Sequence, residues 1–184
     1  LIEVGKNEVW VGTDRKGVMR MTVNHAGEIT GHQSFGAAEG LELGQVAETY
    51  LSDIGGGQWV ASTRKGLFSW DGARFKPAAL GNLRDLRQPE ETFIFVATPN
   101  GELWAYSNTR LFHRAQSGIW KQAEVRQLLR GALVHHKLMA NDQIAFVTSY
   151  GMLIKHAVPE AVSQSRAKVQ LSGVTLLNAD GTKT

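Results

Sequence analysis

Four short turns recur along the sequence, and each precedes a glycine or carries Arg in the place of that glycine. Three of the four turns contain Arg or Lys, and side by side they would form a positively charged surface. Arg offers bidentate hydrogen bonds and Lys a point charge, so this surface would pair carboxylates, sulfates or phosphates. The alternative is that exposed hairpin turns simply favour basic residues. The candidate ligand-binding residues are Arg15, Lys16, Arg64, Lys65, Asn108, Arg110 and Tyr150.

Residues for metal or covalent chemistry do not occur in a recognisable pattern. The chain has no Cys, which excludes disulfides and thiolate metal sites, and none of its six His has a zinc-ligand spacing such as HExxH. His135 and His136 are adjacent, so on a strand they are predicted to point to opposite faces. The sequence also lacks the G-x-S-x-G pattern of a nucleophilic serine. We therefore predict no catalytic residue, no metal and no cofactor.

Carboxylates and aromatic residues give little further evidence of a site. Glu90 and Glu91 are neighbours in the sequence, which predicts a solvated loop rather than an acid–base pair. Most aromatic residues lie in predicted strands, where they are expected to pack in the core. Sugar stacking would need exposed rings, and the candidates for it are Trp70, Trp120 and Tyr150.

The basic turns belong to a longer phrase that occurs four times. Residues 10–21 (WVGTDRKGVMRM) and 59–70 (WVASTRKGLFSW) share Trp-Val and Arg-Lys-Gly at the same offsets, and weaker copies occupy 103–114 and 144–155. The copies are about 45 residues apart on average, which is typical of propeller blades. In the third copy, aligned without gaps, Trp104 falls one place late, and one step along a strand reverses the face. A deleted turn residue or a bulge would restore it.

The surroundings of the phrase repeat as well. Each copy follows a turn-forming cluster and a β-prone run, at 1–4, 46–51, 92–97 and 132–139, and three copies precede a second glycine turn. Each repeat is therefore predicted to be a four-stranded antiparallel meander, with a short helix as the alternative for 124–138. The phrase is apolar on both alternating faces, as in sheets that stack on both sides. An ordinary β-sandwich is the alternative architecture.

The stretches NEVWVGTDRKGVMRM and GGQWVASTRKGLFSWDGARF resemble the two-component regulator propeller repeat. The resemblance covers about residues 1–158, in approximate repeats 1–45, 46–91, 92–131 and 132–158. Residues 166–177 (RAKVQLSGVTLL) look like the start of the Ig-like three-Y domain that commonly follows such propellers, so 159–184 are expected to be a linker and its first strands. The predicted fold is all-β: a β-propeller fragment of about four blades followed by the start of an Ig-like β-sandwich.

The resemblance implies a function. In this family the propellers form a periplasmic sensor, usually continued through a membrane helix into a histidine kinase or a diguanylate cyclase. A non-catalytic, ligand-binding sensor domain is therefore expected, with a small-molecule or oligosaccharide ligand that could be anionic. The remaining blades and the Ig-like domain of the same protein are implied partners, together with a homodimer. The alternatives are a protein-interaction scaffold, or a propeller lyase or glycosidase, which would need His, Tyr or carboxylate groups converging at the axis.

Composition limits the other classes. Hydrophobic residues are 42% and charged residues 20% of the 184, which is typical of a globular domain. The net charge is only +3, and no block of like charges suggests a nucleic-acid partner. No apolar run approaches the roughly 20 residues that cross a bilayer, and no signal peptide is visible. Since the sequence starts at Leu1, a processed or excised piece is expected.

Overall fold

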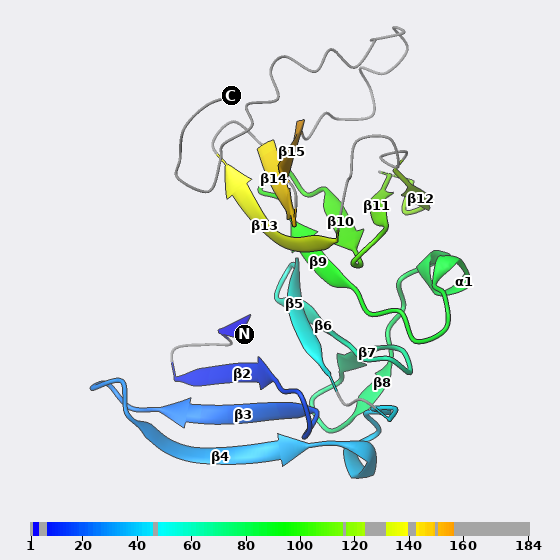
Figure 1. Cartoon of the computed structure of the whole chain (residues 1–184). Helices are drawn as coiled ribbons and strands as arrows, with labels where there is room; N and C mark the ends of the chain where they lie inside the picture. Colours follow the sequence, from blue (N-terminus) through cyan, green and yellow to red (C-terminus); the bar gives the residue numbers. More distant parts are fainter. Residues whose placement is uncertain are drawn as a thin grey trace, which may run out of the picture.

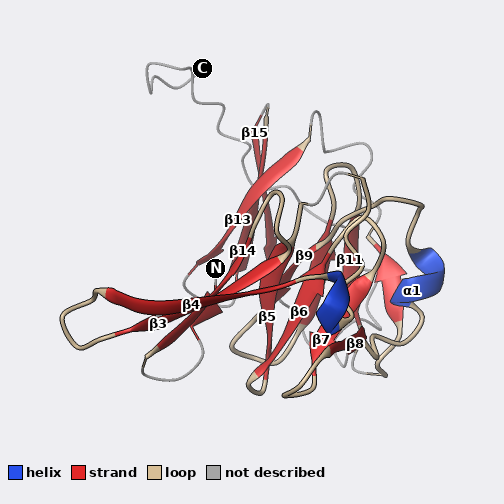
Figure 2. Cartoon of the chain, turned by 90° about the horizontal axis from the view of Figure 1, so that it is seen from below, coloured by secondary structure: helices blue, strands red, loops and turns tan. Residues whose placement is uncertain are grey.

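The computed structural model describes residues 2–3, 7–45, 48–115, 117–123, 132–139, 143–149 and 151–156. Within these ranges the chain is all-β, and its helical segments are one 3-10 turn, η1 (Ala37–Glu39), and one short helix, α1 (Leu83–Leu86). Figure 2 shows both as small pieces beside a body of strands. No helix in the described part is long and apolar enough to cross a bilayer.

The strands form four separate antiparallel sheets in chain order. In Figure 1 they succeed one another from the blue first sheet to the yellow and orange fourth sheet. The first sheet contains β1 (Ile2–Glu3), β2 (Glu8–Gly12), β3 (Val18–Val23) and β4 (Ile29–Phe35). The second contains β5 (Tyr50–Gly55), β6 (Gln58–Ser62), β7 (Leu67–Trp70) and β8 (Phe75–Pro77). The third contains β9 (Ile94–Ala97), β10 (Leu103–Tyr106), β11 (Leu111–Arg114) and β12 (Trp120–Gln122). The fourth contains β13 (Leu133–Met139), β14 (Gln143–Thr148) and β15 (Gly151–His156).

This arrangement agrees with the predicted meanders for the first three sheets, because neighbours in sequence are neighbours in each sheet. In the fourth sheet three strands are described. Residues 133–139 are a strand, so the helical alternative is wrong for that part, while 124–131 and 159–184 lie outside the described residues. The strand predicted at 46–51 is described only from Tyr50, where β5 begins and continues to Gly55. No strand of the fourth sheet pairs with the first among the described residues.

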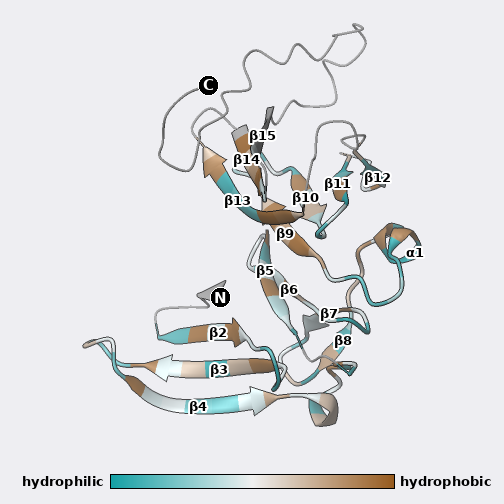
Figure 3. Cartoon of the chain, in the orientation of Figure 1, coloured by the Kyte–Doolittle hydropathy of each residue, from teal (hydrophilic) through white to brown (hydrophobic). Residues whose placement is uncertain are grey.

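Three apolar clusters fill the spaces between successive sheets. Because side chains alternate along a strand, one sheet supplies two of them: Val60 belongs to the cluster with the third sheet, and Ala61 to the cluster with the first. Figure 3 shows hydrophobic segments along β2, β5, β9 and β10, which all contribute residues to these clusters. Burial on both faces explains why the repeated phrase is apolar throughout rather than alternating.

Gly12 and Gly17 show why the turn after β2 needs glycine. A Cβ on Gly12 would collide with the Thr49 carbonyl oxygen, where the chain enters the second sheet. Gly17 has a φ of +73°, and a Cβ there would lie 2.5 Å from the Phe35 carbonyl oxygen. Gly12 is thus required by the close approach of the backbone, and Gly17 by both a close approach and a left-handed φ.

The Trp residues of the phrase do not all face the same way, and the one that differs is Trp59 rather than Trp104. Equivalent turn hydrogen bonds, from Thr13 N–H to Gly17 O (2.8 Å) and from Thr63 N–H to Gly66 O (2.9 Å), align Thr13 with Thr63. Measured from this turn, Trp10 and Trp104 occupy the same position, and Trp59 lies one residue earlier. The late place of Trp104 in the ungapped alignment therefore comes from a turn that is one residue shorter, 107–110 against 13–17, which is the deleted turn residue expected to restore its face.

The physical reason is the length of the hairpin turn. Five residues, 13–17, connect the last paired positions of β2 and β3, whereas four, 63–66, connect β6 and β7. The extra residue lets the same sequence phrase present Trp on opposite faces. Trp10 consequently points forward to the second sheet and Trp59 back to the first, with ring centroids 5.0 Å apart.

Candidate functional site

The predicted basic residues lie at the tips of hairpins on one edge of the stacked sheets, which we call the turn rim. The Thr at the start of a turn caps it: Thr13 Oγ1 accepts from the Lys16 N–H (2.9 Å), and Thr63 Oγ1 from the Lys65 N–H (3.1 Å). This local bonding leaves Arg15, Lys16 and Lys65 exposed.

Two of the predicted cations are engaged with carboxylates rather than free for a ligand. Arg64 lies 3.8 Å from both Glu48 and Glu90. Arg110 pairs with Glu91, and its Nη2 also donates to the Leu86 carbonyl oxygen at 2.9 Å. The turn rim therefore carries less uncompensated positive charge than the sequence suggests.

Glu91 connects the hydrogen bonds and ion pairs at this part of the turn rim. Its side chain is only 10% exposed, so the prediction of a solvated loop is wrong for this residue. Burial alone would raise the pKa of Glu91, but hydrogen bonds, chiefly from Arg110, outweigh it and lower the pKa. Arg87 adds a second tie, donating to the carbonyl oxygens of Arg64 (2.6 Å) and Glu91 (2.7 Å). The loop before β9 is thereby fixed against the turns of the second and third sheets.

A pocket of about 220 Å³ opens at the turn rim, where three sheets meet. It contains the first residues of the inner strands β5 and β9, the start of β13, and the end of β10 with its turn. Of the predicted site residues, only Asn108 lines it, and Tyr150 lies outside the described residues. The lining residues are Tyr50, Thr92, Ile94, Tyr106, Ser107, Asn108, Leu133 and Val134.

Both tyrosines of this rim pocket remain protonated at neutral pH. Burial raises the pKa of Tyr106 to about 12, with a further contribution from Tyr50. The pKa of Tyr50 is raised by partial burial and by the carboxylates of Glu48 and Asp14, against a smaller opposing effect of Arg64. The hydroxyl groups are thus weak acids and hydrogen-bonding groups, and they are poor candidates for a base.

A polar pair of rings lies behind the pocket. The Tyr106 hydroxyl is 3.0 Å from Nδ1 of His136, and burial, with His135 beside it, lowers the pKa of His136. His135 and His136 do not point to opposite faces as predicted: their rings stack with centroids 5.7 Å apart. The backbone of both residues pairs regularly with β14, and the register shift of β13 lies before them, between Leu133 and His135.

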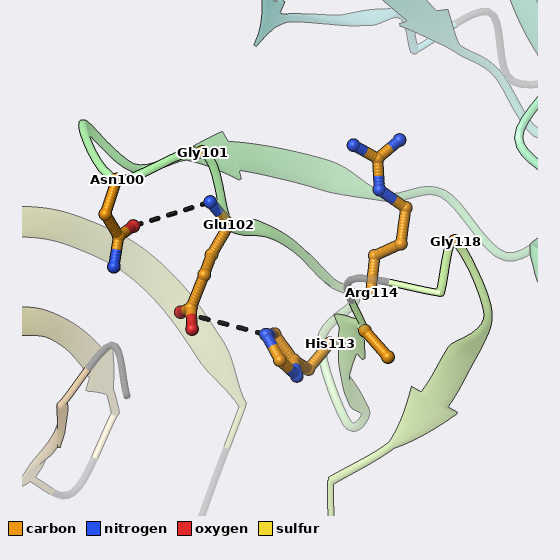
Figure 4. Close-up of a pocket in the computed structure, with 7 residues that line it drawn as sticks. Asn100, Gly101, Glu102, His113, Arg114 and Gly118 are labelled. Atoms are coloured by element: carbon orange, nitrogen blue, oxygen red, sulfur yellow. Dashed lines mark hydrogen bonds and ion pairs between the residues drawn. The ribbon is translucent and has the colours of Figure 1, made fainter. Parts of the chain in front are cut away.

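A second cavity, of about 290 Å³, lies at the opposite edge of the third sheet. Figure 4 shows Glu102 and His113 facing each other there, with the Arg114 guanidinium turned away from them. Glu102 Oε2 is 3.7 Å from His113 Nε2 and accepts from Trp104 Nε1 at 3.3 Å. No group of three or more metal-ligating side chains occurs in the described ranges.

The sequence interpretation missed most of the rim pocket. Tyr50, Tyr106 and Val134 lie in predicted strands and were not among the candidate residues, yet all three line the pocket, with Tyr50 37% and Val134 55% exposed. The available signal was their place at the ends of predicted strands, on the same edge as the basic turns. Conversely, Trp120, a candidate for sugar stacking, is fully buried.

Comparison with known proteins shows the fold but no family. The chain matches no protein-family model, and no curated protein matches it. A solved structure described as the extracellular domain of a proposed hybrid two component system, BT3049 from B. thetaiotaomicron, covers 96% of this chain with a TM-score of 0.58 and 16% identity. The chain spans about a quarter (26%) of that protein. At this identity the likeness concerns the fold alone.

Proposed function

We propose that this chain is the ligand-binding, extracytoplasmic part of a membrane-bound bacterial signalling protein, with a histidine kinase or a diguanylate cyclase as its output. The observation that carries the proposal is the likeness of nearly the whole chain to the extracellular domain of a two-component system protein. The proposed sensor is non-catalytic and periplasmic, and the pocket at the turn rim supports the ligand-binding part of the proposal.

The proposed architecture is an arc of a β-propeller whose other blades belong to the same protein. On the outward face of the first sheet, Val9 and Val11 pair with Met21 and Met19, and all four are half-exposed. The equivalent strand positions in the third sheet, Leu103 and Ala105, are buried against the preceding sheet. A further blade would cover this apolar block and remove the liability of an open sheet face. The proposed Ig-like segment at 159–184 would follow the last blade.

Signalling requires that a ligand prefer one arrangement of blades and stalk over another, because binding both equally shifts no population. The rim pocket is suited to this, since its lining comes from the second, third and fourth sheets. A preference of about 1–3 kcal/mol would be enough for a useful response. We propose that the receptor acts as a homodimer, as the family resemblance implies.

The proposal is tested on the full-length gene product in its own bacterium. An epitope placed in the exposed β3–β4 turn near Gly27 should co-sediment with membranes, resist protease in intact cells and be cleaved once the outer membrane is opened. Deleting residues 7–156 should abolish the ligand response while the protein remains in the membrane. A cytoplasmic epitope would contradict the sensor; turnover of a substrate would favour the enzyme, and binding only to a protein would favour the scaffold.

A further inference from the structure

The rim pocket contains no charged side chain among its lining residues. Its polar groups are hydroxyls and the Asn108 amide, and its apolar groups include two exposed side chains, Tyr50 and Val134. A charged ligand buried here would lose hydration without gaining a partner. The lining therefore selects against both anions and cations.

The charged residues around the rim pocket also disfavour binding of an anion. The nearest predicted cations are paired, Arg64 with Glu48 and Glu90, and Arg110 with Glu91. Burial is the main reason for the raised pKa of Tyr50, and the carboxylates of Glu48 and Asp14 raise this pKa more than Arg64 lowers it. The carboxylates beside the Tyr50 hydroxyl therefore disfavour a further negative charge at this end of the pocket.

A β-bulge in β13 orients one of the side chains that line the pocket. The register of β13 shifts between Leu133 and His135, and the intervening Val134 projects into the pocket instead of joining the ladder. The Leu133 N–H still donates to the Asn108 carbonyl oxygen at 2.8 Å, which holds β13 at the turn of the third sheet. Bulges commonly re-aim a side chain in this way next to functional sites. Tyr50 lines the same pocket from the second sheet.

We propose that the rim pocket binds an uncharged molecule, with its apolar face between Tyr50 and Val134 and its hydroxyl or carbonyl groups toward Thr92 and Asn108. The inference rests on the proposed function, since it assigns a ligand class to that sensor. The cavity of about 220 Å³ is smaller than the roughly 300–1,000 Å³ of drug-sized sites, so it takes a single ring or one residue of a longer ligand. A bound ligand would contact residues of the second, third and fourth sheets at the same time.

The test uses three probes of one shape and different charge: 4-hydroxybenzamide, 4-hydroxybenzoate and 4-(aminomethyl)phenol. Each is titrated to millimolar concentration into the whole chain, and amide shifts are followed by NMR. The uncharged amide should perturb Thr92, Asn108 and Val134 and bind at least tenfold more tightly than either ion. Tyr50→Ala should weaken it about tenfold. Val134→Asp should also weaken it and reverse the preference toward the cationic probe.

Ile119→Ala is the matched control, because Ile119 is a similarly exposed apolar residue on the other edge of the third sheet. This variant should bind like the parent, and well-dispersed spectra confirm that each variant is folded. Preference for 4-hydroxybenzoate, shifts confined to Arg15, Lys16 and Lys65, or no shift at the three pocket amides with the uncharged probe would overturn the proposal. A receptor that signals to an anion would leave the sensor function standing, whereas a cytoplasmic location would remove that function without affecting pocket binding.

Discussion

The interface between the second and third sheets is bridged by hydrogen bonds between side chain and backbone, whereas the third and fourth sheets separate at the rim pocket, which Tyr50 of the second sheet also lines. In the bridged interface, hydroxyl groups of one sheet accept from backbone N–H groups of the next, Ser52 from Phe95 (3.0 Å) and Ser62 from Phe93 (2.8 Å). In the open interface of the third and fourth sheets, the Tyr106 hydroxyl instead lies against Nδ1 of His136, and the rim pocket lies beside Leu133. The comparison indicates that the same four-stranded sheet can pack closely against one neighbour and form a pocket with another, depending on how the inner strands of the two sheets contact each other.

The largest expected effect comes from deleting a ring in the bridged interface. Phe112 is fully buried there, and Phe112→Ala should lower the free energy of unfolding by about 3–5 kcal/mol, because the cavity cannot collapse. Phe146→Ala makes the same change in the open interface and should cost less, since this side has room to relax. Urea unfolding of both variants measures the difference. Equal losses would show that the two interfaces do not differ in packing.

The buried ion pair of the turn rim should give the next largest effect. Arg110→Gln leaves the Glu91 carboxylate buried without its partner and should cost about 2–3 kcal/mol. The lowered pKa of Glu91 means that its stabilisation is present above the ordinary Glu value of 4.5 and is lost as pH falls through the folded value. Acid unfolding of the variant should therefore be less steep. Arg15→Gln, at an exposed turn, is the control and should change stability by less than about 0.5 kcal/mol.

Removing one hydrogen bond across the interface of the second and third sheets, without changing its apolar core, should lower the free energy of unfolding by about 1–2 kcal/mol. Ser52→Ala leaves the Phe95 N–H without its side-chain acceptor in a buried position. Hydrogen exchange should then rise at Phe95 more than at the amides of the third sheet that bond within β-ladders. A matched Ser34→Ala change on exposed β4 should alter neither stability nor exchange at Phe95.

The smallest effect concerns the polar pair of the open interface. Because the folded pKa of His136 is below the ordinary value of 6.5, its contribution is complete above that value and declines as pH falls toward the folded pKa. His136→Gln should flatten the loss of stability on acidification, as measured by urea midpoints across this range. Tyr106→Phe should lower stability by about 0.5–1.5 kcal/mol. An unchanged pH profile in His136→Gln would mean that His136 is not a determinant of this interface.

Several features could be predicted from the sequence because they depend on local chemistry. Turn clusters marked the hairpins, and apolar residues on both alternating positions indicated sheets that stack on both faces. The direction of Trp59 could not be predicted, since one extra residue in the turn after β2 changes which face a matching sequence presents. The roles of Arg110 and Glu91 were missed for another reason: they are 19 residues apart and meet only when two loops fold together.

By itself, the sequence determined the all-β class, the repeated four-stranded unit and the edge where its basic turns lie, because periodicity and turn residues act over a few neighbouring positions. Only the tertiary structure decided which of those basic residues are neutralised, where the sheets separate, and that Tyr50 and Val134 come to line one pocket. Those outcomes depend on contacts between distant segments, whose burial and pairing are set by how the sheets stack.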